Sequence, residues 1–181
     1  EFVVTNSFHG TVFSSIYGKQ FASVISGKID KRRQSLMHQL GLENNLIKPE
    51  DFVYLDAGTT TERMIEYIQT TKAVFVTNAI SHAKLLSEKG CRVYILGGEF
   101  KSQTEAIVGE EAMETLDKYN FTKGFWGTNG ISVSKGFSTP ELKEAMVKKK
   151  SMANCKKCYV LADASKFDQM SSVKFADFEQ A

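Results

Sequence analysis

Short apolar runs that alternate with amphipathic stretches constrain the fold of this chain more than any other feature of its sequence. Runs of this length predict buried strands, and they occupy residues 52–56, 73–77, 92–96, 123–126 and 158–163. Strands that are apolar throughout are typical of a sheet covered on both faces. The stretches between them have helical spacing, which favours βαβ units and parallel pairing. The expected fold class is therefore α/β, with a mainly parallel sheet and flanking helices.

The composition of the 181 residues excludes several classes of protein. With 42% hydrophobic and 24% charged residues, the chain has the balance of an ordinary globular protein. No apolar run approaches the roughly 18–20 residues that a membrane span needs, and the sequence opens with no leader, so we expect a cytoplasmic protein without membrane contact. Residues 47–181 carry 18 basic and 18 acidic side chains, whereas a domain that grips DNA usually has a basic excess.

The chain has three cysteines, Cys91, Cys155 and Cys158. An odd, low number argues against a disulfide framework and fits a reducing compartment. Cys155 and Cys158 form a CxxC pair, which is either two thiols at a helix-to-strand junction or half of a metal site. A zinc site needs a second pair of ligands, and none lies nearby in the sequence. We therefore expect neither a metal nor a cofactor.

Glycines, hydroxyls, amides and charged groups gather where the expected strands end. In an open α/β sheet, ligands bind beyond the carboxyl ends of the strands. The strand ends therefore predict a ligand site lined by Asp56, Gly58, Thr59, Thr60, Thr61, Thr77, Asn78, Gly97, Gly98, Gly127, Asn129, Gly130, Asp163 and Lys166.

The chemistry of these residues indicates a small phosphorylated polyol as the ligand. Glycines let backbone amides approach an oxyanion, and a helix N-terminus adds partial positive charge. Lys166 supplies a full positive charge, and the carboxylates of Asp56 and Asp163 can accept hydrogen bonds from sugar hydroxyls. Each feature also has a structural alternative: residues 58–61 as a helix cap, the Gly97–Gly98 pair as a turn, and Asp163 as a cap for the next segment.

Six motifs carry a resemblance to a known family, at residues 55–60, 76–79, 96–98, 125–131, 144–148 and 161–167. Through them, residues 47–181 resemble the C-terminal sensor domain of DeoR-type bacterial transcription repressors. The resemblance implies a fold like that of ribose-5-phosphate isomerase and CoA transferases. It also implies a sugar-phosphate effector that alters the DNA affinity of an N-terminal winged helix-turn-helix, without catalysis. Lys148 would lie near this ligand.

The resemblance sets expectations about partners as well. The lysine-rich composition and the stretch at 136–140 favour fructose-1-phosphate or tagatose-6-phosphate as the effector, and we expect a homo-oligomer. No helix-turn-helix precedes residue 47 in this sequence, so operator DNA would be bound only through an N-terminal domain that it lacks. The family often has Asp where this chain has Thr122, and it usually continues past Ala181 with another strand.

Residues 1–46 resemble something different, a C-terminal fragment of polysaccharide pyruvyl transferases. The resemblance rests on residues 2–14 and 41–46, and it implies that Ser7, His9 and Gly10 contact an anionic donor. The alternative for His9 is a packing or capping role. The expected domain organisation is therefore a transferase-like segment at 1–46 and a sensor domain at 47–181, joined near residues 46–48.

A sugar-phosphate isomerase is the enzymatic alternative for residues 47–181. Its chemistry needs a carboxylate base beside the substrate, and Glu144 is the best-placed candidate. The isomerases precede their base with a glycine-rich loop, whereas this chain has Ser-Thr-Pro at 138–140. Glu144 can instead bind a sugar hydroxyl or pair with Lys148 one helical turn later. We therefore favour a sensor over an enzyme.

Several further residues have mainly structural interpretations. Thr139 and Pro140 predict the start of a helix as its N-cap and first residue. The run of lysines at 148–150 is expected to face solvent, apart from Lys148. Trp126 is expected in the core rather than stacked on a ligand. His82 is expected to be exposed or half-buried, with no role.

Overall fold

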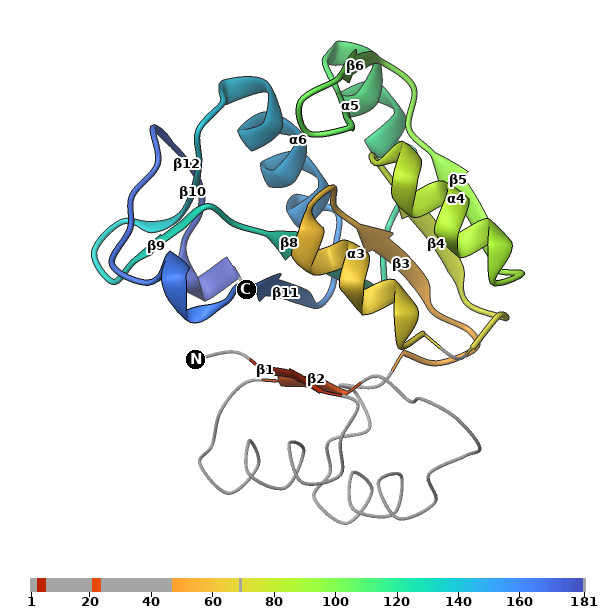
Figure 1. Ribbon diagram of the computed structural model, residues 1–181. Coiled ribbons are helices and arrows are strands. Elements are labelled where there is room, and N and C mark those ends of the chain that lie inside the picture. The colour runs from red at the N-terminus through yellow and green to blue at the C-terminus, as the bar shows by residue number, and fades with distance from the viewer. Residues whose placement is uncertain (1–2, 6–20, 24–46, 69, 181) are drawn as a thin grey trace.

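The computed structural model describes residues 3–5, 21–23, 47–68 and 70–180 (Figure 1). Strands β1 (Val3–Thr5) and β2 (Phe21–Ser23) pair in parallel. The transferase-like residues Ser7, His9 and Gly10 lie outside the described residues. None of the helices in the described part of the chain combines the length and the apolar character that crossing a bilayer requires.

The main sheet has five parallel strands, in the order β11-β8-β3-β4-β5. In chain order they are β3 (Phe52–Leu55), β4 (Val74–Thr77), β5 (Arg92–Ile95), β8 (Lys123–Gly127) and β11 (Cys158–Leu161). Each corresponds to one of the apolar runs in the sequence. The structure thus confirms the α/β fold class and the parallel sheet.

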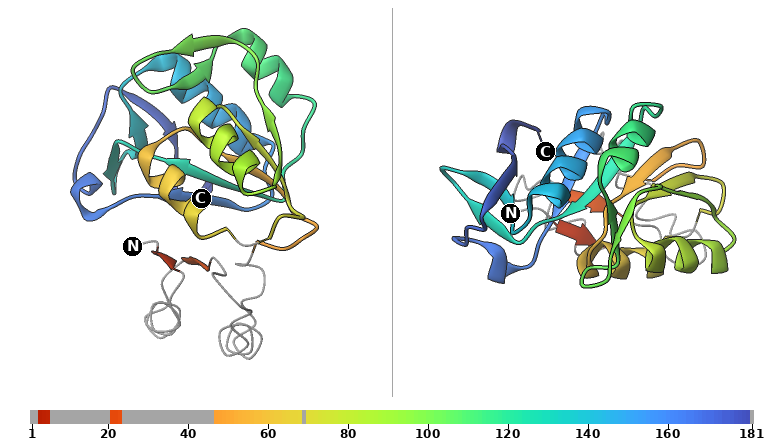
Figure 2. Two further views of the ribbon diagram at one scale, coloured as in Figure 1. Left: turned by 45° about the vertical axis from the view of Figure 1, so that its right-hand side comes forward. Right: turned by 90° about the horizontal axis from the view of Figure 1, so that it is seen from above.

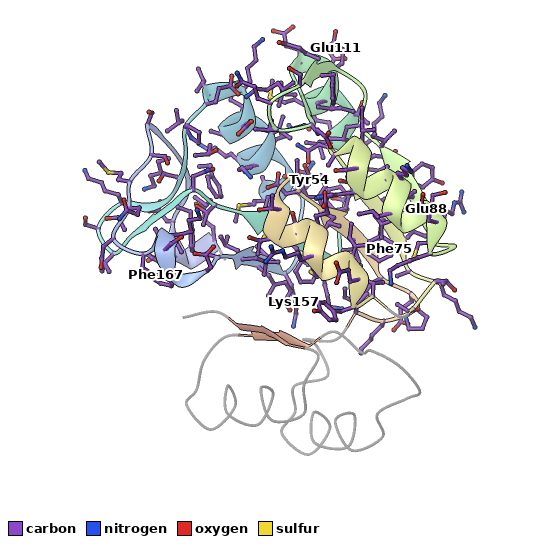
Figure 3. All side chains as sticks on the ribbon, viewed as in Figure 1. Tyr54, Phe75, Glu88, Glu111, Lys157 and Phe167 are labelled. Atoms are coloured by element: carbon purple, nitrogen blue, oxygen red, sulfur yellow. The ribbon has the colours of Figure 1, made fainter. Side chains whose placement is uncertain are left out.

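Helices cover both faces of this sheet, as the view from above in Figure 2 shows. The helices are α3 (Thr59–Glu66), α4 (Ile80–Glu88), α5 (Glu110–Leu116) and α6 (Leu142–Ala153). In β3, β4, β8 and β11, alternate residues enter separate apolar clusters. Tyr54 packs in the cluster that includes residues of α5 and α6, whereas Phe75 packs with residues of α3 and α4 (Figure 3).

The strand order reverses between β3 and β8, and this reversal determines where a ligand can bind. After β3 the chain adds β4 and β5 on one side, and it then returns to add β8 and β11 on the other. The connections on the two sides leave the sheet in opposite directions, which opens a crevice at the carboxyl ends of the two strands. Asp56 follows β3 and Gly127 ends β8, so both lie at this point.

Two small sheets add elements that the sequence did not predict. The first is a hairpin of β6 (Glu99–Lys101) and β7 (Ala106–Val108). The second is an antiparallel sheet of β9 (Gly130–Ser132), β10 (Gly136–Thr139) and β12 (Val173–Ala176). Short 3-10 helices lie between β11 and β12, at η2 (Ala164–Lys166), and after β12, at η3 (Phe178–Gln180). The three-residue strands leave too short a pattern for periodicity to reveal, and β10 and β12 mix polar with apolar residues instead of forming a continuous apolar run.

The start of α6 differs from the prediction. Thr139 ends β10, and Glu141 is the N-cap of the helix, where its side chain accepts a hydrogen bond of 3.3 Å from the amide of Glu144. Pro140 therefore lies before the cap rather than at the first helical position. The carboxylate of Glu141 thus satisfies one of the free amides at the start of the helix.

Candidate functional site

A cavity of about 520 Å³ opens at the carboxyl ends of the main sheet. Its walls come from the turns after β3 and β4, the 102–105 loop of the β6–β7 hairpin, and the residues after β8 and β11. The predicted site residues that line it are Asp56, Gly58, Thr59, Thr60, Asn78, Gly127, Asn129, Glu144, Lys148, Asp163 and Lys166. The fold thus brings most of the predicted strand ends to one cavity.

Two of the predicted threonines lie behind the lining, not in it. Thr61 is fully buried, and its hydroxyl donates a hydrogen bond of 2.7 Å to the carbonyl of Asp56. Thr77 is equally buried, and its hydroxyl accepts a hydrogen bond of 3.1 Å from the amide of Ala79. Both side chains therefore stabilise the turns that carry the cavity residues.

Three of the predicted glycines also lie away from the cavity. Gly98 has a φ of +133°, and a Cβ there would come within 2.5 Å of the carbonyl oxygen of Val108. At Gly130 a Cβ would come within 2.6 Å of the carbonyl oxygen of Gln169. Gly97 has open space around its Cβ position. Gly98 and Gly130 thus allow two backbone segments to approach closely, and the Gly97–Gly98 pair fits its turn alternative.

A buried ion pair between Asp56 and Lys148 lies beside the switch point. Asp56 also accepts a hydrogen bond of 3.2 Å from the amide of Gly127, and Lys148 donates one of 3.1 Å to the carbonyl of the same residue. Burial raises the pKa of Asp56, while the ammonium of Lys148 counteracts this effect. The pair therefore connects β3, β8 and α6 and puts one fixed ammonium group in the cavity wall.

The first turn of α3 presents free hydrogen-bond donors to the cavity. The N-cap is Gly58, which has no side chain to accept from the first amides of the helix. Thr59 and Thr60 are exposed and line the cavity. Uncapped amides and hydroxyls at a helix N-terminus form a ready site for an anion.

Two further charged residues line the cavity. Lys166 ends η2, and Asp163 is the residue just before η2. Among the described residues, Lys166 forms no ion pair, so its ammonium group is available to a ligand. Asp163 accepts hydrogen bonds of 2.8 Å from the amide and 2.5 Å from the hydroxyl of Ser165, which lower its pKa. Asp163 thus caps η2 and lines the cavity at once, so both of its predicted roles are compatible.

Asn78 fixes two strand ends relative to each other. Its side-chain oxygen accepts a hydrogen bond of 2.8 Å from the amide of Ala57, and its side-chain nitrogen donates one of 3.3 Å to the carbonyl of Ile107. The side chain is 3% exposed. Asn78 therefore positions the turn after β3 against the β6–β7 hairpin while it lines the cavity.

Glu144 is held by three side chains from other elements. Its Oε1 accepts hydrogen bonds of 2.8 Å from Lys101 and 3.0 Å from Thr104, and its Oε2 lies 3.3 Å from the hydroxyl of Thr139. Burial alone would lower the pKa of Lys101, but its hydrogen bonds to Glu141 and Glu144 raise it. The suggested Glu144–Lys148 pair is wrong, because Lys148 pairs with Asp56 instead.

The cavity also has lining residues that the sequence interpretation missed. They are Ala57, Glu62, Ala79, Ser81, His82, Ser102, Gln103, Thr104, Glu105, Ala106, Thr128 and Pro140. The polar run at 102–105 gave no strand-end signal, because the strands on either side of it were not predicted. The prediction for His82 is wrong, since the residue is 1% exposed. His82 lies three residues after the buried N-cap residue Ala79, on the same face of the helix, and this spacing was the available clue.

The described residues contain no group of three or more His, Cys, Asp or Glu side chains placed to hold a metal ion. What the cavity offers instead is one free ammonium, a helix N-terminus and several hydrogen-bonded carboxylates. This arrangement can bind an anionic group at one side and hydroxyl groups at the other.

Comparison with known proteins gives the family. A family model described as the DeoR C terminal sensor domain matches residues 40–181. The chain belongs to this family. The match confirms the resemblance seen in the sequence, and it begins at residue 40, ahead of the domain boundary expected at residue 47. Residues 1–39 of the chain lie outside the match.

Curated relatives of the sensor domain are transcription regulators. The chain is 44% identical over 138 residues to an uncharacterized HTH-type transcriptional regulator, FruR, of Bacillus subtilis, which covers 76% of this chain and 55% of that protein. It is 31% identical over 138 residues to a lactose phosphotransferase system repressor of Streptococcus mutans, which covers 75% and 55%. The chain therefore spans about half the length of the curated relatives it matches.

Among solved structures, ribose 5 phosphate isomerase A from Neisseria gonorrhoeae is similar to the sensor domain. The TM-score is 0.48 at 14% sequence identity, over 70% of this chain and 49% of that one. At these values the likeness carries no inference about activity. The α/β fold class rests on the strands and helices described above.

Proposed function

We propose that this DeoR-type sensor domain binds a phosphorylated sugar in the cavity beside β3 and β8. The observation that carries the proposal is the meeting of an uncapped helix N-terminus at Gly58 with the free ammonium of Lys166 in one cavity. Its volume of about 520 Å³ lies within the usual range for small-molecule sites. The phosphate would bind at Thr59 and Thr60, with the sugar hydroxyls toward Asp163 and Glu144.

The ligand would act as the effector of a transcription repressor in the cytoplasm. The names of the relatives support this role, and one of them is a repressor of a sugar phosphotransferase system. A ligand that binds one arrangement of the sensor domain more tightly shifts the population toward it. Operator DNA would be bound by a domain outside this sequence. Self-association is part of the proposal, and the exposed apolar side chains of Ile95 and Phe100 are consistent with it.

Binding without catalysis is proposed because of the surroundings of Glu144. A base that moves a proton between substrate carbons must present a free carboxylate oxygen to them. Both oxygens of Glu144 have hydrogen-bonding partners, on Lys101, Thr104 and Thr139. Aldose–ketose turnover that disappears in Glu144→Gln would overturn this part of the proposal.

Isothermal titration calorimetry tests the binding itself. The ligands are fructose-1-phosphate, tagatose-6-phosphate and ribose-5-phosphate, with unphosphorylated fructose as the negative control. Lys166→Met is expected to weaken binding of a phosphorylated sugar by about tenfold or more, because a charge-assisted contact is lost. Lys157→Met is the matched control, since Lys157 is exposed and precedes the amino end of β11, away from the cavity (Figure 3). Absence of heat with every phosphorylated sugar would reject the proposal.

A further inference from the structure

His82 is a buried titratable side chain in the cavity wall that the proposed function leaves without a role. It is the third residue of α4, it is 1% exposed, and it lines the cavity beside Gly58 and Glu62. An imidazole is the side chain whose charge changes most readily near neutral pH. Its contacts therefore determine whether it can respond to a bound anion.

One nitrogen of the ring contacts the turn proposed to hold the phosphate. Nε2 lies 3.2 Å from the carbonyl oxygen of Gly58 and 3.9 Å from a carboxylate oxygen of Glu62. A carbonyl oxygen only accepts, so the hydrogen bond requires a proton on Nε2. The same carbonyl accepts a hydrogen bond of 2.9 Å from the amide of Glu62, and the hydroxyl of Thr61, which donates to the carbonyl of Asp56, lies 2.8 Å from it. His82 thus supports the N-cap residue of α3 from behind.

The other nitrogen of the ring is buried without a partner among the described residues. Nδ1 of His82 has no hydrogen bond, although most buried polar atoms have one. With the proton of the neutral ring on Nε2, Nδ1 is a bare acceptor. It is therefore the atom at which the ring can gain a second proton.

The charges around the ring leave it responsive to a ligand. The pKa of His82 lies below its ordinary value, because burial outweighs the opposing effects of the carboxylate of Glu62, on the neighbouring helix α3, and of the Gly58 carbonyl. β4, which packs against α4, carries no titratable side chain, and on β5 Arg92 and Tyr94 contact each other. On α4 itself, Lys84 pairs with Glu88. The other ionisable groups around the cavity are Asp56, Glu105, Glu144, Lys148, Asp163 and Lys166.

We propose that His82 takes up a proton from solvent at Nδ1 when a doubly charged anion binds at the start of α3. The inference rests on the proposed function, because it requires the anion to bind at Thr59 and Thr60. The added negative charge favours the imidazolium, which keeps its hydrogen bond to the Gly58 carbonyl. The cavity then binds a dianion more tightly as the pH falls toward neutrality, and His82 acts as a positioning residue that reports the charge of the effector.

Nuclear magnetic resonance titration of the histidine side chains tests this directly. The probes are fructose-1-phosphate and inorganic sulfate, since sulfate keeps its charge across the pH range whereas a phosphate ester takes up a proton near about pH 6. The signal of His82 is assigned by its loss in His82→Gln. We expect its pKa to rise by about one pH unit with either probe, which corresponds to about tenfold tighter binding to the protonated ring. An unchanged pKa of His82 with a probe bound would overturn the inference.

The variant His82→Gln separates positioning from proton uptake. The glutamine amide can donate to the Gly58 carbonyl, but it does not titrate. We expect the variant to bind sulfate at high pH as the parent does and to lose the increase in affinity at lower pH. Retention of the full pH dependence in this variant would contradict the inference. Absence of binding in the parent at every pH would instead reject the proposed function. If the variant does not fold, the titration of His82 in the parent protein decides the inference on its own.

Discussion

Lys148 of helix α6 forms a buried ion pair with Asp56, 92 residues earlier in the chain, at the end of β3. Lys148 also donates to the carbonyl of Gly127 at the end of β8. The ion pair therefore joins β3 to β8, the two neighbouring strands between which the strand order reverses. The ammonium of Lys148 additionally lies 5.5 Å from the ring centre of Phe175. One side chain thus links the main sheet, α6 and the small antiparallel sheet beside the cavity.

Removal of one partner of this pair is expected to destabilise the fold strongly. Lys148→Met leaves the carboxylate of Asp56 buried without its cation, which typically costs about 3–5 kcal/mol. The measurement is urea unfolding at neutral pH. The double variant Asp56→Asn with Lys148→Met is the control, and we expect it to be more stable than Lys148→Met alone. Strictly additive effects of the two substitutions would contradict a coupled pair.

Substitution of the neighbouring residues Thr60 and Thr61 is expected to affect different properties, ligand binding for Thr60 and stability for Thr61. The hydroxyl of Thr61 is buried and donates to the carbonyl of Asp56, so Thr61→Val is expected to cost about 1–3 kcal/mol of stability. Thr60 is exposed in the cavity, so Thr60→Val is expected to leave stability nearly unchanged and to weaken sugar-phosphate binding. Thermal unfolding and calorimetric titration of both variants would check this. The reverse pattern would place the ligand contact on Thr61.

The two glycines of the pair at 97–98 provide a second matched comparison. Gly98 has a positive φ and no room for a Cβ, so Gly98→Ala is expected to cost about 1–3 kcal/mol in backbone strain. Gly97→Ala is expected to stay within about 0.5 kcal/mol, because its Cβ position is open. Neither residue lines the cavity, so sugar-phosphate affinity should change little in either variant. A large loss of affinity in a folded Gly97→Ala protein would restore the phosphate-cradle interpretation.

The main sheet was predictable from the sequence because its strands are continuously apolar. The pattern around β3, for example, located both the strand and the position of Asp56 after it. The β6–β7 hairpin was not predictable in this way, since its strands have only three residues each. The cavity-lining loop at 102–105 depends on that hairpin, so its contribution to the site was missed as well.

The buried face of α6 does not follow from the spacing of its apolar residues. Leu142 and Met146 are apolar yet exposed, whereas Lys148 and Ser151 are polar yet buried. The reason is tertiary, because Ser151 accepts a hydrogen bond of 2.9 Å from the indole of Trp126 and Lys148 pairs with Asp56. A polar residue becomes a core residue once a distant partner satisfies it, and periodicity contains no information about such partners. Trp126 itself is fully buried, as its core interpretation predicted.

A second buried ion pair lies beside Thr122, between the start of β3 and the start of β8. Asp51 pairs with Lys123, and both side chains are buried. The hydroxyl of Thr122 donates a hydrogen bond of 2.8 Å to the same carboxylate. Asp51 thus supplies, from the residue before β3, a carboxylate next to the lysine that begins β8.

This pair is expected to make stability depend on pH in the acid range. Burial opposes ionisation of Asp51, but hydrogen bonds from Lys123, the amide of Lys48 and Thr122 together hold its pKa below the ordinary value of 3.8. A lowered folded-state pKa stabilises the protein above the unfolded-state value, and this contribution is lost as the pH falls through the folded-state pKa. Asp51→Asn should therefore reduce the free energy of unfolding at neutral pH by about 3–5 kcal/mol, since Lys123 is left buried without an anion. Urea unfolding of parent and variant from neutral pH to below pH 3.8 should show the difference shrinking. A difference that stays constant over this range would mean that the charge of Asp51 does not stabilise the fold.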